Sequence, residues 1–173
     1  MTKYSSSSSY SIYEAVIASL MFLGIGIVIA NTSEIIWTKV ISILISIGIV
    51  ILIILYQRKR TFDIKFLENE IIIEYPFLKK TSQVPYVDLL QIEFISAYRT
   101  PNRNRIKFKI GNKIESLRFL TVAQSDQYIE FIKWLKSKND KLELKVFPSD
   151  HIMNHKIQEV YGFKYRKILK KTL

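Results

Sequence analysis

The stretch Ile51–Phe62, ILIILYQRKRTF, marks an abrupt change in the chain. A run of aliphatic residues stops at Tyr56, and three bases follow at once, Arg58, Lys59 and Arg60. The first 56 residues carry two bases and two acids, whereas Gln57–Leu173 carries 24 Lys plus Arg and 13 Asp plus Glu. An apolar, uncharged part therefore precedes a basic part, which suggests an anionic neighbour such as lipid headgroups or an acidic protein.

The apolar run before these bases is long enough for a membrane helix. Val40–Tyr56 holds 17 uncharged residues, roughly 25 Å of helix, and Ile35–Trp37 extends it to the ~30 Å hydrocarbon thickness. Trp37 and Tyr56 fall near the two ends, as in an aromatic belt, and Lys39 is close enough to one end to snorkel outward. A buried, isoleucine-rich β core is the competing interpretation, but the run lacks turn residues.

A second apolar run, Ala15–Ala30, predicts another helix. Asn31–Glu34 is the only connection between the two runs, so we expect an antiparallel hairpin over residues 12–57. A cleaved signal peptide is the alternative, but the start of the chain has one lysine and a serine run instead of a basic region. We expect residues 1–11 to be a disordered, serine-rich N-terminus.

Small residues and flanking bases predict how this hairpin packs and which way it faces. Small side chains at helical spacing let two helix backbones approach, and the candidates are Ala15 with Ser19 and Ser42 with Ser46. The bases flanking the second run place Gln57 onward, and the N-terminus with it, on the cytoplasmic side by the positive-inside rule. We expect a multi-pass protein of the bacterial cytoplasmic membrane.

After Arg60 the hydrophobic period changes to two. Six short strands are predicted at residues 61–66, 71–77, 81–85, 90–99, 105–110 and 114–120, joined by short turns, as in an antiparallel sandwich or open barrel. A helix is predicted next, with Thr121 and Gln124 as a capping box and Asn139 at its end. Its apolar stripe comprises Tyr128, Phe131, Ile132 and Leu135.

The order of strands closed by one amphipathic helix resembles pleckstrin-homology (PH) domains. Asn69–Phe94 is similar to the bacterial PH-like domains that follow paired transmembrane helices, with Pro85, Tyr86 and Asp88 at the Pro-Tyr-x-Asp/Glu positions. The resemblance covers Thr61 to about Lys138 and implies an α+β fold for residues 58–140 and a membrane-attached scaffold. The first loop, Leu67–Glu70, is acidic, which argues against specific inositide binding.

The remaining residues, 141–173, form a basic C-terminal extension. Residues 141–147 could add a strand, and Ser149 can cap a short helix that Gly162 closes. His151, His155 and Glu159 could share a face of that helix, but two histidines and one acid on a surface helix are usually solvated, so we predict no metal site.

No catalytic signature or glycine-rich phosphate loop occurs in the sequence, so we expect no enzymatic activity, no cofactor and no small-molecule substrate. The strongest remaining site is basic. Arg105, Lys107 and Lys109 share a strand face by alternation, and no motif supports nucleic-acid binding. The bases predicted to contact anionic membrane or a partner are Arg58, Lys59, Arg60, Arg99, Arg103, Arg105, Lys107, Lys109, Lys164, Arg166 and Lys167.

Two functions remain open. The chain could be a non-enzymatic, membrane-anchored scaffold that presents a protein-binding surface and touches anionic headgroups weakly. It could instead be an immunity-type or accessory subunit of a larger membrane complex that acts through its transmembrane hairpin.

Overall fold

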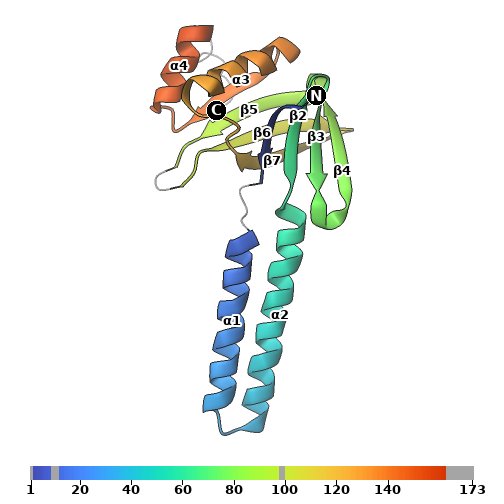
Figure 1. Cartoon of the computed structure of the whole chain (residues 1–173), viewed down its shortest axis with the longest axis vertical. Coiled ribbons are helices and arrows are strands. Elements are labelled where there is room, and N and C mark those ends of the chain that lie inside the picture. Colours follow the sequence, from blue (N-terminus) through green and yellow to red (C-terminus); the bar gives the residue numbers. More distant parts are fainter. Residues whose placement is uncertain (1, 9–11, 98–99, 163–173) are drawn as a thin grey trace. The chain divides into compact units, whose positions relative to one another are not determined.

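The computed structural model describes residues 2–8, 12–97 and 100–162 of an α+β protein (Figure 1). The chain divides into a helical unit, residues 10–62 and 75–80, and a β-rich unit, residues 1–9, 63–74 and 81–173. In chain order the elements are β1 (Thr2–Ser7), α1 (Ile12–Thr32), α2 (Ile36–Arg60), β2 (Asp63–Leu67), β3 (Glu70–Tyr75), η1 (Pro76–Leu78), β4 (Lys80–Pro85), η2 (Tyr86–Asp88), β5 (Leu89–Ile95), β6 (Arg103–Ile110), β7 (Lys113–Leu120), α3 (Ser125–Lys138), β8 (Glu143–Phe147) and α4 (Ile152–Tyr161).

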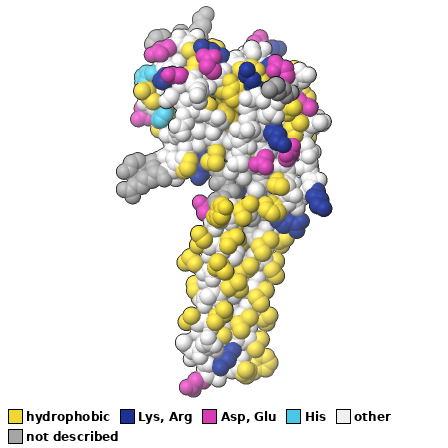
Figure 2. All heavy atoms as spheres, viewed as in Figure 1, with side chains coloured by type: hydrophobic (Ala, Val, Ile, Leu, Met, Phe, Trp, Pro, Cys, Tyr) yellow, Lys and Arg dark blue, Asp and Glu magenta, His cyan; other side chains and the backbone are white. Residues whose placement is uncertain are grey.

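The helical unit is a hairpin of two apolar helices. At 21 and 25 residues, α1 and α2 are roughly 32 and 38 Å long, enough to cross a bilayer. Their buried residues are Gly26, Ala30 and Ser46, and most of their large aliphatic side chains are exposed. On the face shown in Figure 2, hydrophobic side chains cover both helices. The two predicted helices are therefore confirmed, and the alternative of a buried β core is wrong.

The N-terminal serine run forms a strand, which differs from the disorder expected of it. β1 pairs antiparallel with β2, with Tyr4 opposite Phe66 and Ser6 opposite Ile64. Ser8 bridges Phe119 of β7, and the Ser6 hydroxyl donates a hydrogen bond to the Leu120 carbonyl at 2.5 Å. The physical reason is that the backbone of β1 is hydrogen-bonded along β2, with one further bridge to β7, so the strand is held by pairing although most of its side chains are small hydroxyls.

Two four-stranded sheets make up the β-rich unit. Their orders are β1-β2-β3-β4 and β7-β6-β5-β8, with every described pairing antiparallel except β5 with β8. All six predicted strands are present. Their inward faces are fully or almost fully buried, notably at Ile64, Phe66, Ile71, Ile73, Ile92, Phe94, Ile106, Phe108 and Phe119. Alternation along each strand thus places polar residues on the outer faces.

Helix α3 covers the core with the predicted apolar stripe. Phe131 is fully buried at the centre of an aromatic cluster, with ring centroids 4.9 Å from Tyr4, 5.1 Å from Phe66 and 5.9 Å from Tyr128. The helix ends at Lys138 with Asn139 as its C-cap, as predicted. Residues from β1, β2 and α3 thus share one core.

The predicted capping box at the start of α3 is wrong. Gln124 is the N-cap but makes no side-chain capping bond, and the Thr121 hydroxyl donates instead to the Ala123 carbonyl at 2.7 Å. This local hydrogen bond, which short hydroxyl side chains form readily in turns, removes Thr121 from the cap.

The C-terminal extension adds β8 and α4 to the unit. α4 begins two residues later than Ser149 would have allowed, because the His151 imidazole is its N-cap and accepts a hydrogen bond from the Met153 amide at 3.1 Å. The same ring lies 5.3 Å from that of Phe94. His151 therefore has a capping and packing role, and Gly162 closes the helix as expected.

The Pro85–Asp88 segment ties both sheets to α3. The Tyr86 hydroxyl donates to the Leu67 carbonyl of β2 at 2.6 Å, and its ring packs edge-on against Trp134 of α3 at 5.6 Å. The Asn139 side-chain amide donates to the Tyr86 and Leu89 carbonyls, each at 2.9 Å. Burial, and then the charges of Glu68 and Glu70, raises the pKa of Tyr86, so the hydroxyl stays a donor at any physiological pH.

The helical hairpin is inserted, in sequence, between two strands that pair with each other. β1 ends at Ser7 opposite Asp63, and the chain between them contains both α1 and α2. A cleaved signal peptide would remove β1 with the helix that follows it. β1 belongs to the β-rich unit although it precedes both apolar helices in the sequence.

Replacing residues 9–61 with a short Asn-Gly turn should give a soluble, folded domain, since adjacent antiparallel strands can be joined by a tight turn. A matched chain that begins at Thr61 lacks β1 and exposes Phe66 and Phe131, so it should unfold at a lower urea concentration. Urea denaturation followed by tryptophan fluorescence measures both. Equal midpoints would show that β1 contributes nothing to the domain.

Candidate functional site

The two helices of the hairpin are in tight contact at a pair of small residues. A Cβ added at Gly26 of α1 would meet the Ser46 Oγ at 2.0 Å and the Ser46 Cβ at 2.8 Å. The Ser42 hydroxyl donates a hydrogen bond to the Lys39 carbonyl at 2.9 Å, and the Ser46 hydroxyl donates one to the Ser42 carbonyl at 2.8 Å. Ser42 and Ser46 thus pack between the helices, and their partner is Gly26, which sequence reasoning missed.

Ala15 and Ser19 have a different place from the one predicted. They line a cavity of about 350 Å³ between the helices, together with Val16, Val50 and Ile54. The Ser19 hydroxyl donates to the Ala15 carbonyl of its own helix at 2.8 Å. The small side chains of Ala15 and Ser19 therefore leave a cavity between the helices, whereas at Gly26 and Ser46 the two helices are in contact.

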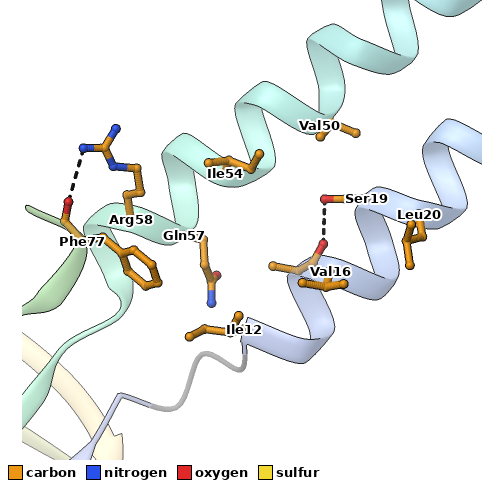
Figure 3. Close-up of a pocket in the computed structure, with 10 residues that line it drawn as sticks. Ile12, Val16, Ser19, Leu20, Val50, Ile54, Gln57, Arg58 and Phe77 are labelled. Atoms are coloured by element: carbon orange, nitrogen blue, oxygen red, sulfur yellow. Dashed lines mark hydrogen bonds between the residues drawn. The ribbon is translucent and has the colours of Figure 1, made fainter.

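The polar end of this cavity is formed by the last turn of α2 and by η1 (Figure 3). The Gln57 side chain extends from α2 toward Ile12 of α1, and its Nε2 is buried with no hydrogen-bond partner among the described residues. Arg58 turns toward η1 and donates to the Phe77 carbonyl at 3.3 Å. A buried amide donor and an exposed guanidinium therefore border an otherwise apolar space.

The other two predicted bases of this turn are also exposed. The Arg60 guanidinium carbon lies 4.1 Å from the centre of the Tyr56 ring, a cation–π distance, and Lys59 is exposed. Arg99, Lys164, Arg166 and Lys167, the remaining predicted bases outside β6, lie outside the described residues.

A second candidate site is the outer face of the β7-β6-β5-β8 sheet, which we call the basic face. Arg103, Arg105, Lys107 and Lys109 alternate along β6 with buried Asn104, Ile106 and Phe108, so they share this face as expected. The register adds two bases that were not predicted, Arg118 opposite Arg105 and Lys145 beside Glu93. Arg118 joins the face through the β6–β7 pairing, and Lys145 joins it through the parallel pairing of β8 with β5.

Charges on the basic face are only partly neutralised. Arg105 forms an ion pair with Glu93 at 2.9 Å, and Lys145 pairs with Glu143 at 3.1 Å. Among the described residues, Arg103, Lys107, Lys109 and Arg118 have no ion-pair partner. In the part of the chain that the structure describes, the face carries six bases and two acids, so it has a net positive charge.

Apolar side chains adjoin these bases. At one end of the face the register aligns Leu120, Arg103, Ile95 and Phe147 across the four strands. Phe147, at the end of this row, is 60% exposed. Apolar side chains and bases therefore share this face of the sheet.

The acidic turn between β2 and β3 contacts α3. Lys138 donates a hydrogen bond to the Glu68 carboxylate, and this bond lowers the pKa of Glu68. One acid of the turn is thus directed to the end of α3, and the turn presents no cluster of bases.

The chain matches no protein-family model and no curated protein sequence. Its candidate sites therefore rest on geometry and charge.

Substituting Gly26 with Ala should loosen the hairpin, because the added methyl overlaps Ser46. Gly24→Ala is the matched control, since its Cβ meets nothing within 4 Å and Ala favours helix. Thermal unfolding of the full chain in detergent, followed by circular dichroism, should show a lower midpoint for Gly26→Ala only. Adding Ser46→Gly should restore it, and a failure of that rescue would place the strain elsewhere.

Proposed function

We propose that this protein is a membrane-anchored adaptor whose PH-like domain docks an acidic protein partner on the basic face. The observation that carries the proposal is the composition of that face. Arg103, Lys107, Lys109 and Arg118, which have no ion-pair partner among the described residues, share it with a row that contains Ile95 and exposed Phe147. The proposal assigns the chain no reaction, cofactor or small-molecule substrate, and anionic headgroups are only a weak, secondary contact.

The arrangement of strands supports a PH-like domain. Strands β1–β4 form one sheet, β5–β7 belong to the other, and α3 follows them and packs on the core, which is the order that the sequence resemblance implies. In this interpretation the hairpin occupies the first connection between strands, and β8 and α4 are additions. The PH-like part then includes β1, which the expected boundary of residues 58–140 leaves out.

Both ends of the hairpin belong to one side of the membrane in this proposal. β1 and β2 are neighbours in one sheet, so the strands before and after the two spans cannot be on opposite sides. Arg58, Lys59 and Arg60 flank the end of α2, whereas the connection between the helices holds Glu34. By the positive-inside rule the β-rich unit is cytoplasmic, at the inner membrane of a bacterium.

A protein partner fits the basic face better than lipid or nucleic acid. Two of its bases are already held by Glu93 and Glu143, which would repel phosphates brought close to them. The neighbouring row with Ile95 and Phe147 offers apolar area, which protein interfaces use at their centre with charges at the rim. Glu93 and Glu143 lie on the same face as the bases, so the face carries a pattern of positive and negative charges. A protein with the complementary pattern would bind better than others.

The alternative, an accessory subunit acting through its hairpin, rested on small residues in the helices. Ser42 and Ser46 are used inside the hairpin against Gly26, so they are not available to a partner helix. We therefore place the partner surface on the β-rich unit.

Thiol labelling tests the topology, because the chain has no cysteine of its own. A membrane-impermeant maleimide should label Glu34→Cys in intact spheroplasts, and should label Ser5→Cys and Lys113→Cys only after lysis. Labelling of Ser5→Cys and Lys113→Cys from opposite sides would contradict both the topology and the pairing of β1.

Site-specific photo-crosslinking tests the docking face. A photoreactive residue in place of Lys107 should yield a protein adduct in membranes, whereas one at Gln83, exposed on the edge strand β4, should not. Changing Lys109 and Arg118 to Glu should abolish the adduct at position 107, and 1 M salt should weaken it by shortening the screening length to ~3 Å. Equal adducts at both positions, or adducts with lipid alone, would refute an adaptor role for this face.

A further inference from the structure

The cavity between α1 and α2 lies in the part of the hairpin nearest the three bases. Ile12, Ala15, Ser19 and Leu20 border it on α1, which is about 12 Å of helix. Farther along, the contact of Gly26 with Ser46 closes the space between the helices. The cavity therefore has the depth of one leaflet, about half of the ~30 Å hydrocarbon layer.

Its walls match a hydrocarbon chain. Val16, Leu20, Val50 and Ile54 supply aliphatic surface, and the Ser19 hydroxyl is already bonded to the Ala15 carbonyl, so it does not make the wall polar. A volume of about 350 Å³ is within the ~300–1,000 Å³ typical of small-molecule sites. Ala15 and Ser19 create this space, because larger side chains there would fill it.

Polar groups are confined to one end of the cavity. Gln57 Nε2 is a buried donor without a partner in the part of the chain that the structure describes, and leaving such a group unbonded in an apolar surrounding is unfavourable. Arg58 uses one donor on the Phe77 carbonyl and remains exposed, with Lys59 next to it. The end of the cavity thus offers an amide donor and positive charge to an acceptor-rich, anionic group.

We propose that the cavity holds an anionic phospholipid of the cytoplasmic leaflet. One acyl chain lies against Val16 and Ile54, a glycerol ester or phosphate oxygen accepts the hydrogen bond from Gln57, and the phosphate lies near Arg58. The proposal rests on the membrane insertion put forward above. A partner helix fits less well, since it would follow the hairpin through both leaflets, and the cavity ends after one.

Lipid retention by the purified full-length chain tests this site. The chain is washed in detergent, mixed with phosphatidylglycerol or phosphatidylcholine, and analysed by native mass spectrometry. The wild type should retain one phosphatidylglycerol. Ala15→Leu with Ser19→Leu fills the cavity and should reduce retention at least tenfold. Gly48→Leu, a matched small-to-large change with nothing within 4 Å of the added Cβ, should leave it unchanged.

Variants of Arg58 and Gln57 distinguish recognition of the lipid headgroup charge from binding of the lipid as a whole. Arg58→Gln should lower the preference for phosphatidylglycerol over phosphatidylcholine about fivefold, which is the factor that one base near an anionic surface contributes. Gln57→Leu should lower retention of both lipids. The inference is overturned if the wild type holds both lipids equally, if Gly48→Leu loses as much lipid as the cavity-filling variant, or if that variant loses a bound protein instead of lipid.

The same variants are checked by thiol labelling at Glu34→Cys. If the cavity-filling variant has normal topology and unchanged lipid retention, the lipid site is refuted, but the membrane anchor is not. Failure of the wild-type chain to insert at all overturns the anchor, and the lipid site with it.

Discussion

The pairing of β1 with β2 is the interaction on which the rest of the structure depends. It joins the first residues of the chain to a strand that follows two apolar helices, so the helical hairpin becomes a loop of the domain and not an appendage. Through Ser6 and Ser8, β1 also contacts β7, and Tyr4 packs on Phe131 of α3. The strand therefore connects both sheets and the covering helix, and the core is incomplete until it is in place.

This arrangement restricts what the hairpin can do. In the proposed topology, a single membrane span after β1 would put β1 and β2 on opposite sides, so two spans are the smallest number that lets these strands pair. The tight contact of Gly26 with Ser46 holds the helices together near the middle of α2. Toward the C-terminal end of α2, Ala15 and Ser19 leave a cavity beside Gln57 and Arg58. In our proposal the same helices provide a membrane anchor and a lipid site, and the basic face of the domain binds a partner.

Much of this could be predicted from the sequence because local patterns carry it. The change of hydrophobic period after Arg60 indicated the strands, and alternation along β6 placed Arg105, Lys107 and Lys109 on one face. β1 could not be found this way. Of its inward residues only Tyr4 is apolar, and its pairing depends on strands far along the chain. Arg118, Lys145 and Gly26 were missed because strand register and helix packing, which the sequence pattern does not give, determine their neighbours.

Disulfide cross-linking across the insertion tests the central claim most directly. Ser5 of β1 is opposite Lys65 of β2, and directly opposed residues in antiparallel strands are ~4.5–5.5 Å apart at Cα, within the range a disulfide spans. In the otherwise cysteine-free full-length chain, Ser5→Cys with Lys65→Cys should form an intramolecular disulfide in native membranes. Ser5→Cys with Gln83→Cys should not, since β4 is three strands, roughly 14 Å, from β1. No disulfide in the first pair, or equal yields in both, would contradict the inserted hairpin.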